Sequence, residues 1–572
     1  ASAARRALER IPADQWRDEV LTDRRLRAFL QGSTALLAVD PDRESAMKIL
    51  DRVLAILRGE VDDPRYPKGF VSDLDFTDLM RVIQLALIRG EVDPSDVAKL
   101  RNHLAGEYPT SDPIMNRELV RLLVYMQSTA STGRMIEQLT SDIASEEKLH
   151  IAAHAPFLKE GWLTSQKLEL LNFYESAHQL KGGLSLGRYI DNVARQFAGQ
   201  LTEPEKALVL EKGVRWPNGA LAVIANLPAH PGDKILGRLI ALDGQLRDEQ
   251  SEEAARLRLG IVAGLARSRA PEAMAYLRQL YEEEPGRRAI LAMGLAQDPD
   301  GENWPLLIRA LPILEGSAAR EVLSKLATVD RAPDDAEAVR QVILCGLRLK
   351  DDGYDRAVAL LEHWTGEDGA SDAANWEVAM SVWQEWFSKT YERQPAAELP
   401  VESKANKRTY QELLANLEGP AGKSGDAIRG AEVFRRAQCA NCHRYGDVGD
   451  GIGPDLSTVS RRFHQKEILE AIVFPSQVIS DQYASRTIVT TGGRTITGVV
   501  SPLGEDRIVV LQSDGTKMEI DADEIDEELP SKVSVMPEGL LNPLTLAEIA
   551  DLFAYMGDVP KDSVTSRREP AK

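Results

Sequence analysis

The first two thirds of the chain repeat one pattern, in which apolar residues recur three or four positions apart and polar residues fill the other positions. This spacing is that of one face of an α-helix, so each such stretch predicts an amphipathic helix. Short connections rich in Gly, Pro, Asp and Ser separate the stretches. The pattern predicts an all-helical region from the start to about Trp386. Five of its helices are LTDRRLRAFLQGSTALLAV, ESAMKILDRVLAIL, DFTDLMRVIQLALIRG, PSDVAKLRNHLAG and NRELVRLLVYMQS.

Four similar stretches in the middle of the chain indicate internal repeats: GIVAGLARS, ILAMGLAQD, VLSKLATVD and VILCGLRLK. Aligned on Leu265, Leu295, Leu326 and Leu347, they lie 30, 31 and 21 residues apart. This region resembles HEAT-type helical repeats, and the resemblance implies an N-terminal α-solenoid of stacked helices. Because residues 1–200 show no clean period, a plain helical bundle is the alternative.

The helical region is expected to consist of irregular repeats over 1–200 and HEAT-like repeats over 201–392. It ends in NWEVAMSVWQEWF, which places Trp376, Trp383 and Trp386 on one helical face. We expect this aromatic face to close the core or to hold the next domain, rather than to bind a ligand.

The pattern changes after Tyr391. Residues 393–424 read as a linker with one short helix, residues 425–560 as a further domain, and residues 561–572 as a polar tail. Inside that domain, residues 483–530 alternate between apolar and polar in strand fashion. Gly492-Gly493 and Asp514-Gly515 separate the strands where hairpin turns favour residues that tolerate positive φ. We therefore expect an inserted β-hairpin unit with helices on both sides.

Composition excludes several classes of function. The net charge of −20 argues against nucleic acid as a partner, because phosphate backbones select for clustered Lys and Arg. No run of 18 apolar residues is present, so no transmembrane segment is predicted. Only three cysteines occur, too few for a disulfide framework, and Cys345 lies in an apolar run where we expect it to be buried.

The other two cysteines carry the chemistry. Cys439-Ala-Asn-Cys442-His443 has the C-x-x-C-H spacing by which c-type haem is attached: two thiols form thioethers with one porphyrin, and the histidine faces the iron. A zinc site would need a second pair of Cys or His ligands, and none follows. A thioredoxin-like site would need a βαβ setting, whereas this motif follows a helix.

The surrounding sequence supports haem. Gly430 and Phe434 lie on the helix before the motif, GIGPDL follows it, and NPLTLAEIADLFAYMG forms a closing helix with Phe553 and Tyr555. This order resembles class I cytochrome c. It resembles more closely the haem-binding domain family of planctomycete and verrucomicrobial proteins, through CANCH, GDGIGPDL, EAIVFPSQVI, TGGRTITG, LQSDGTKMEI, SVMPEGL and LTLAEIADLFAYM. The resemblance covers about residues 425–558. At Phe474 the family usually has Asp, a difference that concerns only a loop cap.

Four downstream residues compete for the other face of the iron. Met518 lies in a predicted strand, Met556 on an apolar helix face, and His464 at a charged helix start. Met536 lies outside regular structure with Pro537 fixing the backbone after it, and it matches the family's axial-methionine position. We therefore expect Met536 as the second axial ligand, with His464 as the alternative.

The resemblance implies two further contacts. The backbone carbonyl of Pro454 is the expected acceptor for the second ring nitrogen of His443. Arg461 or Arg462 is a candidate partner for a haem propionate, and a solvated surface arginine is the alternative.

These residues predict one covalently attached haem c with His443 and Met536 on its iron. Such ligation leaves no open position and favours electron transfer. Haem attachment outside the cytoplasmic membrane implies a periplasmic or extracellular protein from which a signal has been removed. The family resemblance implies docking to a redox partner, such as a periplasmic β-propeller dehydrogenase. The alternatives are catalysis within the same chain, as in a cytochrome-linked oxidoreductase, or a haem-bearing scaffold.

One acidic stretch stands apart. Residues 519–528 hold seven acidic side chains in ten positions. They either steer a basic redox partner or form a solvated edge that discourages strand pairing. In the first case, charge reversal should slow reduction by the partner at low salt.

Overall fold

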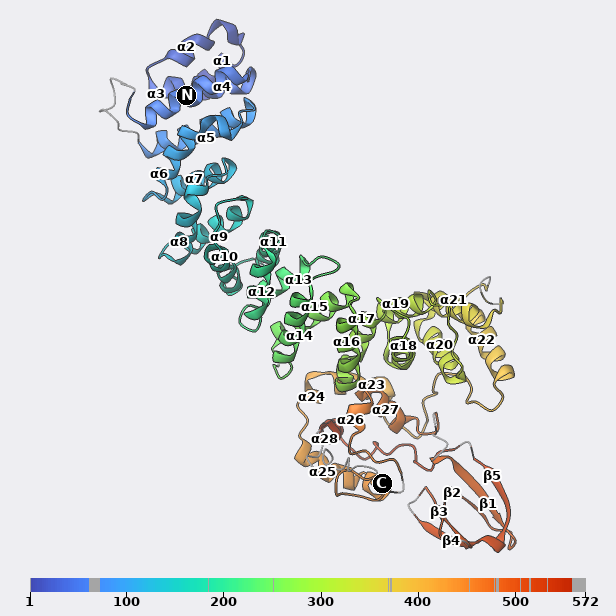
Figure 1. Cartoon of the computed structure of the whole chain (residues 1–572). Helices are drawn as coiled ribbons and strands as arrows, with labels where there is room; N and C mark the ends of the chain where they lie inside the picture. The colour runs from blue at the N-terminus through green and yellow to red at the C-terminus, as the bar shows by residue number, and fades with distance from the viewer. Residues whose placement is uncertain are drawn as a thin grey trace. The chain divides into compact units, whose positions relative to one another are not determined.

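The computed structural model is mainly helical, with a small antiparallel sheet near the C-terminal end, as the sequence predicts (Figure 1). It describes residues 2–60, 72–183, 185–249, 251–368, 370, 373–451, 453–477, 479, 483–504, 506–513, 516–531 and 533–557. The polar tail at 561–572 and the turn residues Asp514 and Gly515 lie outside this range. Within the described part, no helix has the length and the apolar character needed to cross a bilayer.

The chain divides into two compact units, residues 1–264 and 265–572. The division falls inside α15 (Glu252–Ser268), one of the four similar helices of the sequence. The second unit therefore contains three of these helices together with the C-terminal domain. The predicted boundaries at residues 200, 392 and 424 remain predictions.

The first unit is built from helices that pack in chain order, with α3 on α5, α5 on α7 and α7 on α9. The longer helices each bury an apolar face, as Phe29, Leu36 and Leu37 show in α3. Its α-helices before α15 are α1 (Ser2–Leu8), α2 (Arg17–Thr22), α3 (Leu26–Val39), α4 (Arg43–Leu57), α5 (Asp73–Arg89), α6 (Ala98–Glu107), α7 (Pro113–Tyr125), α8 (Thr132–Thr140), α9 (Ser145–His154), α10 (Thr164–Ala177), α11 (Leu186–Ala198), α12 (Glu203–Glu211), α13 (Pro217–Ala225) and α14 (Asp233–Gln245).

The second unit begins with helices that carry the remaining similar stretches. Leu265, Leu295 and Leu326 are fully buried, whereas Leu347 is half-buried. The fourth stretch, VILCGLRLK, has the irregular spacing, and its aligned leucine is also the one that differs in burial. HEAT-type repetition remains a prediction. These helices are α16 (Pro271–Glu283), α17 (Arg288–Leu295), α18 (Trp304–Ala310), α19 (Gly316–Leu326), α20 (Ala336–Leu349), α21 (Tyr354–Thr365) and α22 (Trp376–Thr390).

The tryptophan-rich helix α22 packs on α20 and α21. Trp383 is 2% exposed and meets Trp386 edge-on, with ring centroids 5.4 Å apart. Trp376 lies apart from this pair, below the ammonium of Lys350. Burial of Trp383 fits the expected role of this face in closing a core.

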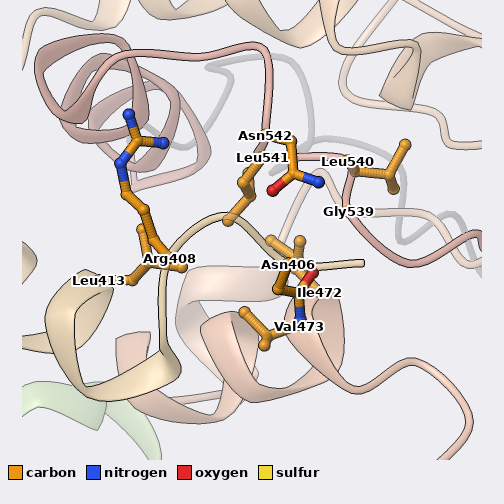
Figure 2. A pocket seen from close by; sticks show the side chains of 9 residues that line it. All are labelled: Asn406, Arg408, Leu413, Ile472, Val473, Gly539, Leu540, Leu541 and Asn542. Atoms are coloured by element: carbon orange, nitrogen blue, oxygen red, sulfur yellow. The ribbon is translucent and has the colours of Figure 1, made fainter. Parts of the chain in front are cut away.

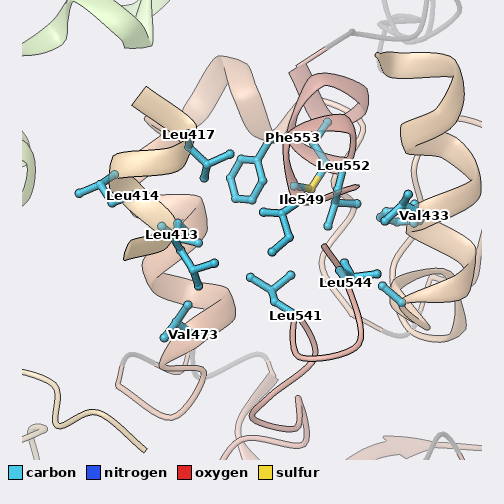
Figure 3. Packing of buried hydrophobic residues seen from close by; sticks show 14 of the residues in the cluster. Leu413, Leu414, Leu417, Val433, Val473, Leu541, Leu544, Ile549, Leu552 and Phe553 are labelled. Atoms are coloured by element: carbon cyan, nitrogen blue, oxygen red, sulfur yellow. The ribbon is translucent and has the colours of Figure 1, made fainter. Parts of the chain in front are cut away.

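Six short helices follow: α23 (Tyr410–Glu418), α24 (Pro420–Lys423), α25 (Ala427–Arg436), α26 (Val459–Arg462), α27 (Gln465–Val473) and α28 (Leu546–Gly557). All of them except α24 contribute to one hydrophobic core, which includes Leu413, Val433, Val473, Ile549 and Leu552 (Figure 3). We call this the helical core. Phe474, the residue that departs from the family pattern, packs against it, with its ring 5.7 Å from that of Tyr410. Phe474 therefore contributes apolar packing to the helical core.

The inserted unit has five strands, in the order β4-β3-β2-β1-β5. The predicted strands appear as β1 (Ser485–Thr490), β2 (Thr495–Pro502), β3 (Arg507–Leu511) and β4 (Lys517–Asp521). Gly493 has φ +77°, so the first turn has the predicted chemistry. The fifth strand, β5 (Ile525–Pro530), was not predicted, and it pairs antiparallel with β1 along the sheet edge.

β5 begins inside the acidic stretch and ends two residues after it. Arg486 on β1 forms an ion pair with Glu528, and Arg507 on β3 pairs with Glu519 at 2.9 Å. The side chains of Asp526 and Glu527 are exposed. An acidic outer strand is a common way to discourage pairing with another sheet, which fits the edge interpretation of these charges.

Candidate functional site

Helix α25 leads into the C-x-x-C-H motif and packs on the closing helix α28. Gly430 allows this close approach, because a Cβ at this position would overlap the backbone carbonyl of Asp551 and the side chain of Tyr555. Phe434, one turn later, is fully buried in the helical core. The glycine and the aromatic residue thus serve the helix packing expected of them.

A buried carboxylate joins the two helices. Asp551 on α28 accepts a backbone hydrogen bond from Asp426 at 2.7 Å and two side-chain hydrogen bonds from Arg429, at 2.7 and 2.8 Å. The hydrogen bonds from Arg429 hold the pKa of the Asp551 carboxyl below its ordinary value. The start of α25 is therefore fixed on α28.

Three aromatic rings extend this contact to the far side of the motif. Tyr445 and Tyr555 have ring centroids 4.4 Å apart, and Phe434 lies 6.1 and 5.6 Å from them. The Tyr445 hydroxyl donates a hydrogen bond of 2.7 Å to the carbonyl oxygen of Tyr555. The segment after the motif is thus also held on α28.

One tight turn contains the whole motif. Gln438 adopts a left-handed conformation with φ +64°, after which Cys439–Asn441 form a single 3₁₀ turn, η8. The backbone N–H groups of Cys442 and His443 both donate to the Cys439 carbonyl oxygen, at 3.2 and 2.9 Å. The turn gathers the two thiols and the histidine into one short segment of backbone.

Both motif thiols are free and half-buried. Burial raises the pKa of Cys439 to about 11, and it also raises the pKa of Cys442. Both thiols are therefore protonated at neutral pH, and Cys439 packs against the helical core. Among the described residues, no group of three or more His, Cys, Asp or Glu side chains is placed to hold a metal ion.

His443 is fixed in orientation and tautomer. Its Nδ1–H donates a 2.9 Å hydrogen bond to the carbonyl oxygen of Pro454, the acceptor expected from the sequence. Gly453 packs against the ring, since a Cβ there would lie 3.0 Å from Nδ1 and Cε1. Burial lowers the pKa of His443, so the ring is neutral. The lone pair of Nε2 is then the one that can bind iron. The ligation itself remains a prediction.

Met536 lies in the loop between β5 and α28 and is half-buried. Its backbone N–H donates to Ser534 Oγ at 3.2 Å. Arg461, at the end of α26, has an exposed side chain. Among the hydrogen bonds and ion pairs of the described residues, none joins Met536 or Arg461 to the motif. The structure thus brings together Cys439, Cys442, His443 and Pro454, and it places the other two predicted residues on separate segments.

The competing ligands have structural roles. Met518 packs against the small core of the sheet, and Met556 is buried in the helical core. His464 caps α27, where its Nδ1 accepts a hydrogen bond of 3.2 Å from the Lys466 backbone N–H. Packing or helix capping accounts for the position of each of these three side chains without iron ligation.

One contact was not foreseen from the sequence. Arg288, only 4% exposed at the start of α17, donates to the carbonyl oxygens of Arg461 and Arg462 at the end of α26. Nearby, the buried Lys466 of α27 forms an ion pair with Glu315. The segment that follows the motif is therefore fixed to the helices that precede the domain. These hydrogen bonds span more than 170 positions, so no local pattern could have indicated them.

The donor set fits a covalently held haem: two free thiols at the required spacing, a neutral histidine with Nε2 available, and an apolar helical framework. A family model described as cytochrome c matches residues 427–494, a range that starts with α25, includes the motif and ends just before β2. A search of curated proteins finds no match to this chain. The C-terminal part of the chain carries a cytochrome c-type domain, which supports a haem-binding, electron-transfer function.

Proposed function

We propose that the chain is a mono-haem c-type cytochrome that carries electrons. Cys439 and Cys442 would form the two thioethers, and His443 and Met536 would be the axial ligands. When bound, the haem supplies an iron that gains one electron from a donor and passes it to an acceptor. The observation that carries the proposal is the hydrogen bond from His443 Nδ1 to Pro454, made inside a C-x-x-C-H turn.

Each of these residues has a task before any electron moves. The half-buried thiols would tether the porphyrin next to the apolar residues of the helical core. The Pro454 carbonyl raises the electron density of His443 and fixes its ring plane. With Met536 as a second ligand, the iron would keep no open position for O₂ or a substrate, and the domain would transfer electrons without binding a reactant.

The remaining parts of the chain would serve recognition. The helical regions offer a large surface on which a redox partner can dock, and a periplasmic dehydrogenase with a β-propeller is the partner class that the family resemblance favours. Covalent haem attachment places the protein in the periplasm or outside the cell. In this role the helical regions select the partner, and the cytochrome domain exchanges the electron.

Optical spectroscopy of the protein exported by a haem-attaching host tests the proposal. We expect a low-spin spectrum, with a sharp α-band when reduced and a weak methionine-to-iron band when oxidised. The band should disappear in Met536→Ala and persist in Met518→Ala, a matched control in the sheet. A high-spin, ligand-binding spectrum of the unchanged protein would contradict the proposal and indicate catalysis at the haem.

A further inference from the structure

The loop that carries Met536 is tied to the rest of the domain on both sides of this residue. On the N-terminal side, the Ser534 backbone N–H donates to Ser476 Oγ at 3.1 Å, just beyond the end of α27. Ser534 Oγ in turn accepts from the Met536 backbone N–H. These two hydrogen bonds form the first tie, and they fix the backbone that leads into Met536.

The second tie is made by Asn542, six residues after Met536. Its Oδ1 accepts a hydrogen bond of 2.7 Å from the Lys407 backbone N–H, and its Nδ2 donates a hydrogen bond of 2.6 Å to the Ala405 carbonyl oxygen. The Asn542 side-chain amide thus makes the kind of paired hydrogen bonds with the linker backbone that a neighbouring β-strand would make. The linker segment 405–407 precedes the matched range 427–494, so the contact comes from outside the cytochrome c match.

The local backbone is shaped around this amide. The Asn542 backbone N–H donates to the Gly539 carbonyl oxygen at 2.9 Å, which closes a turn. Gly539 has φ +78°, and a Cβ there would lie 2.6 Å from Asn542 Nδ2. Glycine therefore provides both the left-handed conformation and the space that the amide occupies.

Packing holds this part of the loop only partly. Residues 539–542 line a small surface hollow, together with Asn406 and Arg408 of the linker (Figure 2). Leu541 packs into the helical core, and hydrogen bonds to the linker hold the side of the loop that borders the hollow. A further bond runs from Arg408 Nη1 to the Leu544 carbonyl oxygen at 3.0 Å.

We infer that Asn542 is a positioning residue, which holds the loop against the linker so that Met536 stays on the iron. The inference rests on the proposed function, because it assumes that Met536 is the axial ligand. Asn542 acts through the loop and does not touch the haem. Loss of its two hydrogen bonds lets the loop move away and makes Met536 easier to displace.

Competition with imidazole for the ferric haem of the full-length protein measures this effect. Each lost hydrogen bond contributes a modest free energy, so Asn542→Ala should bind imidazole about tenfold more tightly than the unchanged protein. Ser534→Ala, which removes the acceptor of the Met536 backbone N–H and keeps the Ser534 N–H bond to Ser476, should bind it about threefold more tightly. The matched control is Asn416→Ala: its Nδ2 donates to the Leu546 carbonyl oxygen at 3.2 Å, outside the loop, and its imidazole affinity should stay unchanged.

The variant Met536→Ala distinguishes a failure of the role inferred for Asn542 from a failure of the axial-ligand assignment. If Met536→Ala greatly increases imidazole affinity while Asn542→Ala and Ser534→Ala match the unchanged protein, the role of Asn542 is refuted and the axial methionine stands. If Met536→Ala leaves the affinity unchanged, the ligand assignment fails, and the inference fails with it. If Asn542→Ala does not fold, Asn542→Asp, which keeps the acceptor for Lys407 and loses the donor to Ala405, decides the question by the same measurement.

Discussion

The cytochrome domain contains two hydrophobic cores that are built in different ways. The helical core combines large apolar residues from α23, α25, α27 and α28 with Leu541 and Leu544 of the loop before α28 (Figure 3). The core of the sheet is centred on Ile488, Ile496, Val510 and Ile520, one residue from each of the first four strands. Since the motif turn packs against the helical core, we conclude that this core, and not the sheet, holds the haem site together.

The links to neighbouring parts differ in the same way. Between the motif and the sheet, Lys517 and Asp450 form an ion pair of 2.9 Å in which both side chains are about half exposed. Between the domain and α17, the buried Arg288 donates two hydrogen bonds to backbone carbonyls, and a third goes to the Tyr281 carbonyl of α16. A buried group with several partners stabilises far more than an exposed ion pair. The haem site should therefore depend first on helix packing, next on Arg288, and least on the sheet.

The largest expected effect is that of Gly430→Val, which tests the packing of α25 on α28. The new side chain would overlap the Asp551 carbonyl and the Tyr555 side chain, so the two helices would have to separate. We expect the free energy of unfolding of the domain to fall by more than about 3 kcal/mol. Denaturant unfolding followed by haem absorbance measures this change.

The control for Gly430 is Gly557→Val, at the last residue of α28. A Cβ at Gly557 would meet no atom within 4 Å, so this variant should change the free energy of unfolding by less than about 1 kcal/mol. Equal losses in the two variants would mean that close helix approach is not what holds the site.

An intermediate effect is expected from Arg288→Met, which keeps the apolar length of the side chain but removes its donors. The carbonyl oxygens of Tyr281, Arg461 and Arg462 would lose their partner in a buried setting. A loss of about 2–3 kcal/mol should follow, with a lower unfolding temperature in both haem absorbance and far-ultraviolet circular dichroism. Arg320→Met, which removes an exposed bond to the Asp352 carbonyl, is the control and should be nearly silent. If both variants behave alike, the domain does not depend on α17.

The smallest effect on the free energy of unfolding is expected from Lys517→Met, which breaks the ion pair to Asp450. Because both side chains are half exposed, the loss should stay below about 1 kcal/mol and shrink further as salt is added. Thermal unfolding at low and high ionic strength checks both points. A large, salt-independent loss would show that the sheet supports the haem site after all.

Local sequence was sufficient for the features that depend on local chemistry. The C-x-x-C-H spacing, Gly430 before it, the four alternating strands and the Gly492-Gly493 turn each follow from residues close together in the chain. The matched cytochrome c range and the antiparallel sheet agree with these predictions.

Features that depend on distant partners were missed. β5 reads as a polar, acidic run, because an edge strand paired with β1 buries too little to show an apolar alternation. Arg288 and Asn542 are ordinary residues in the sequence, and only the fold brings their backbone partners within reach. A resemblance between repeats can suggest stacked helices, but it does not reveal which helix end meets the haem domain.

The mass of the intact, denatured protein tests the central claim most directly. After export by a haem-attaching host, the account predicts the mass of the polypeptide plus one haem, and the bare polypeptide mass for Cys439→Ser combined with Cys442→Ser. A bare mass for the unchanged protein, or more than one haem per chain, would contradict it.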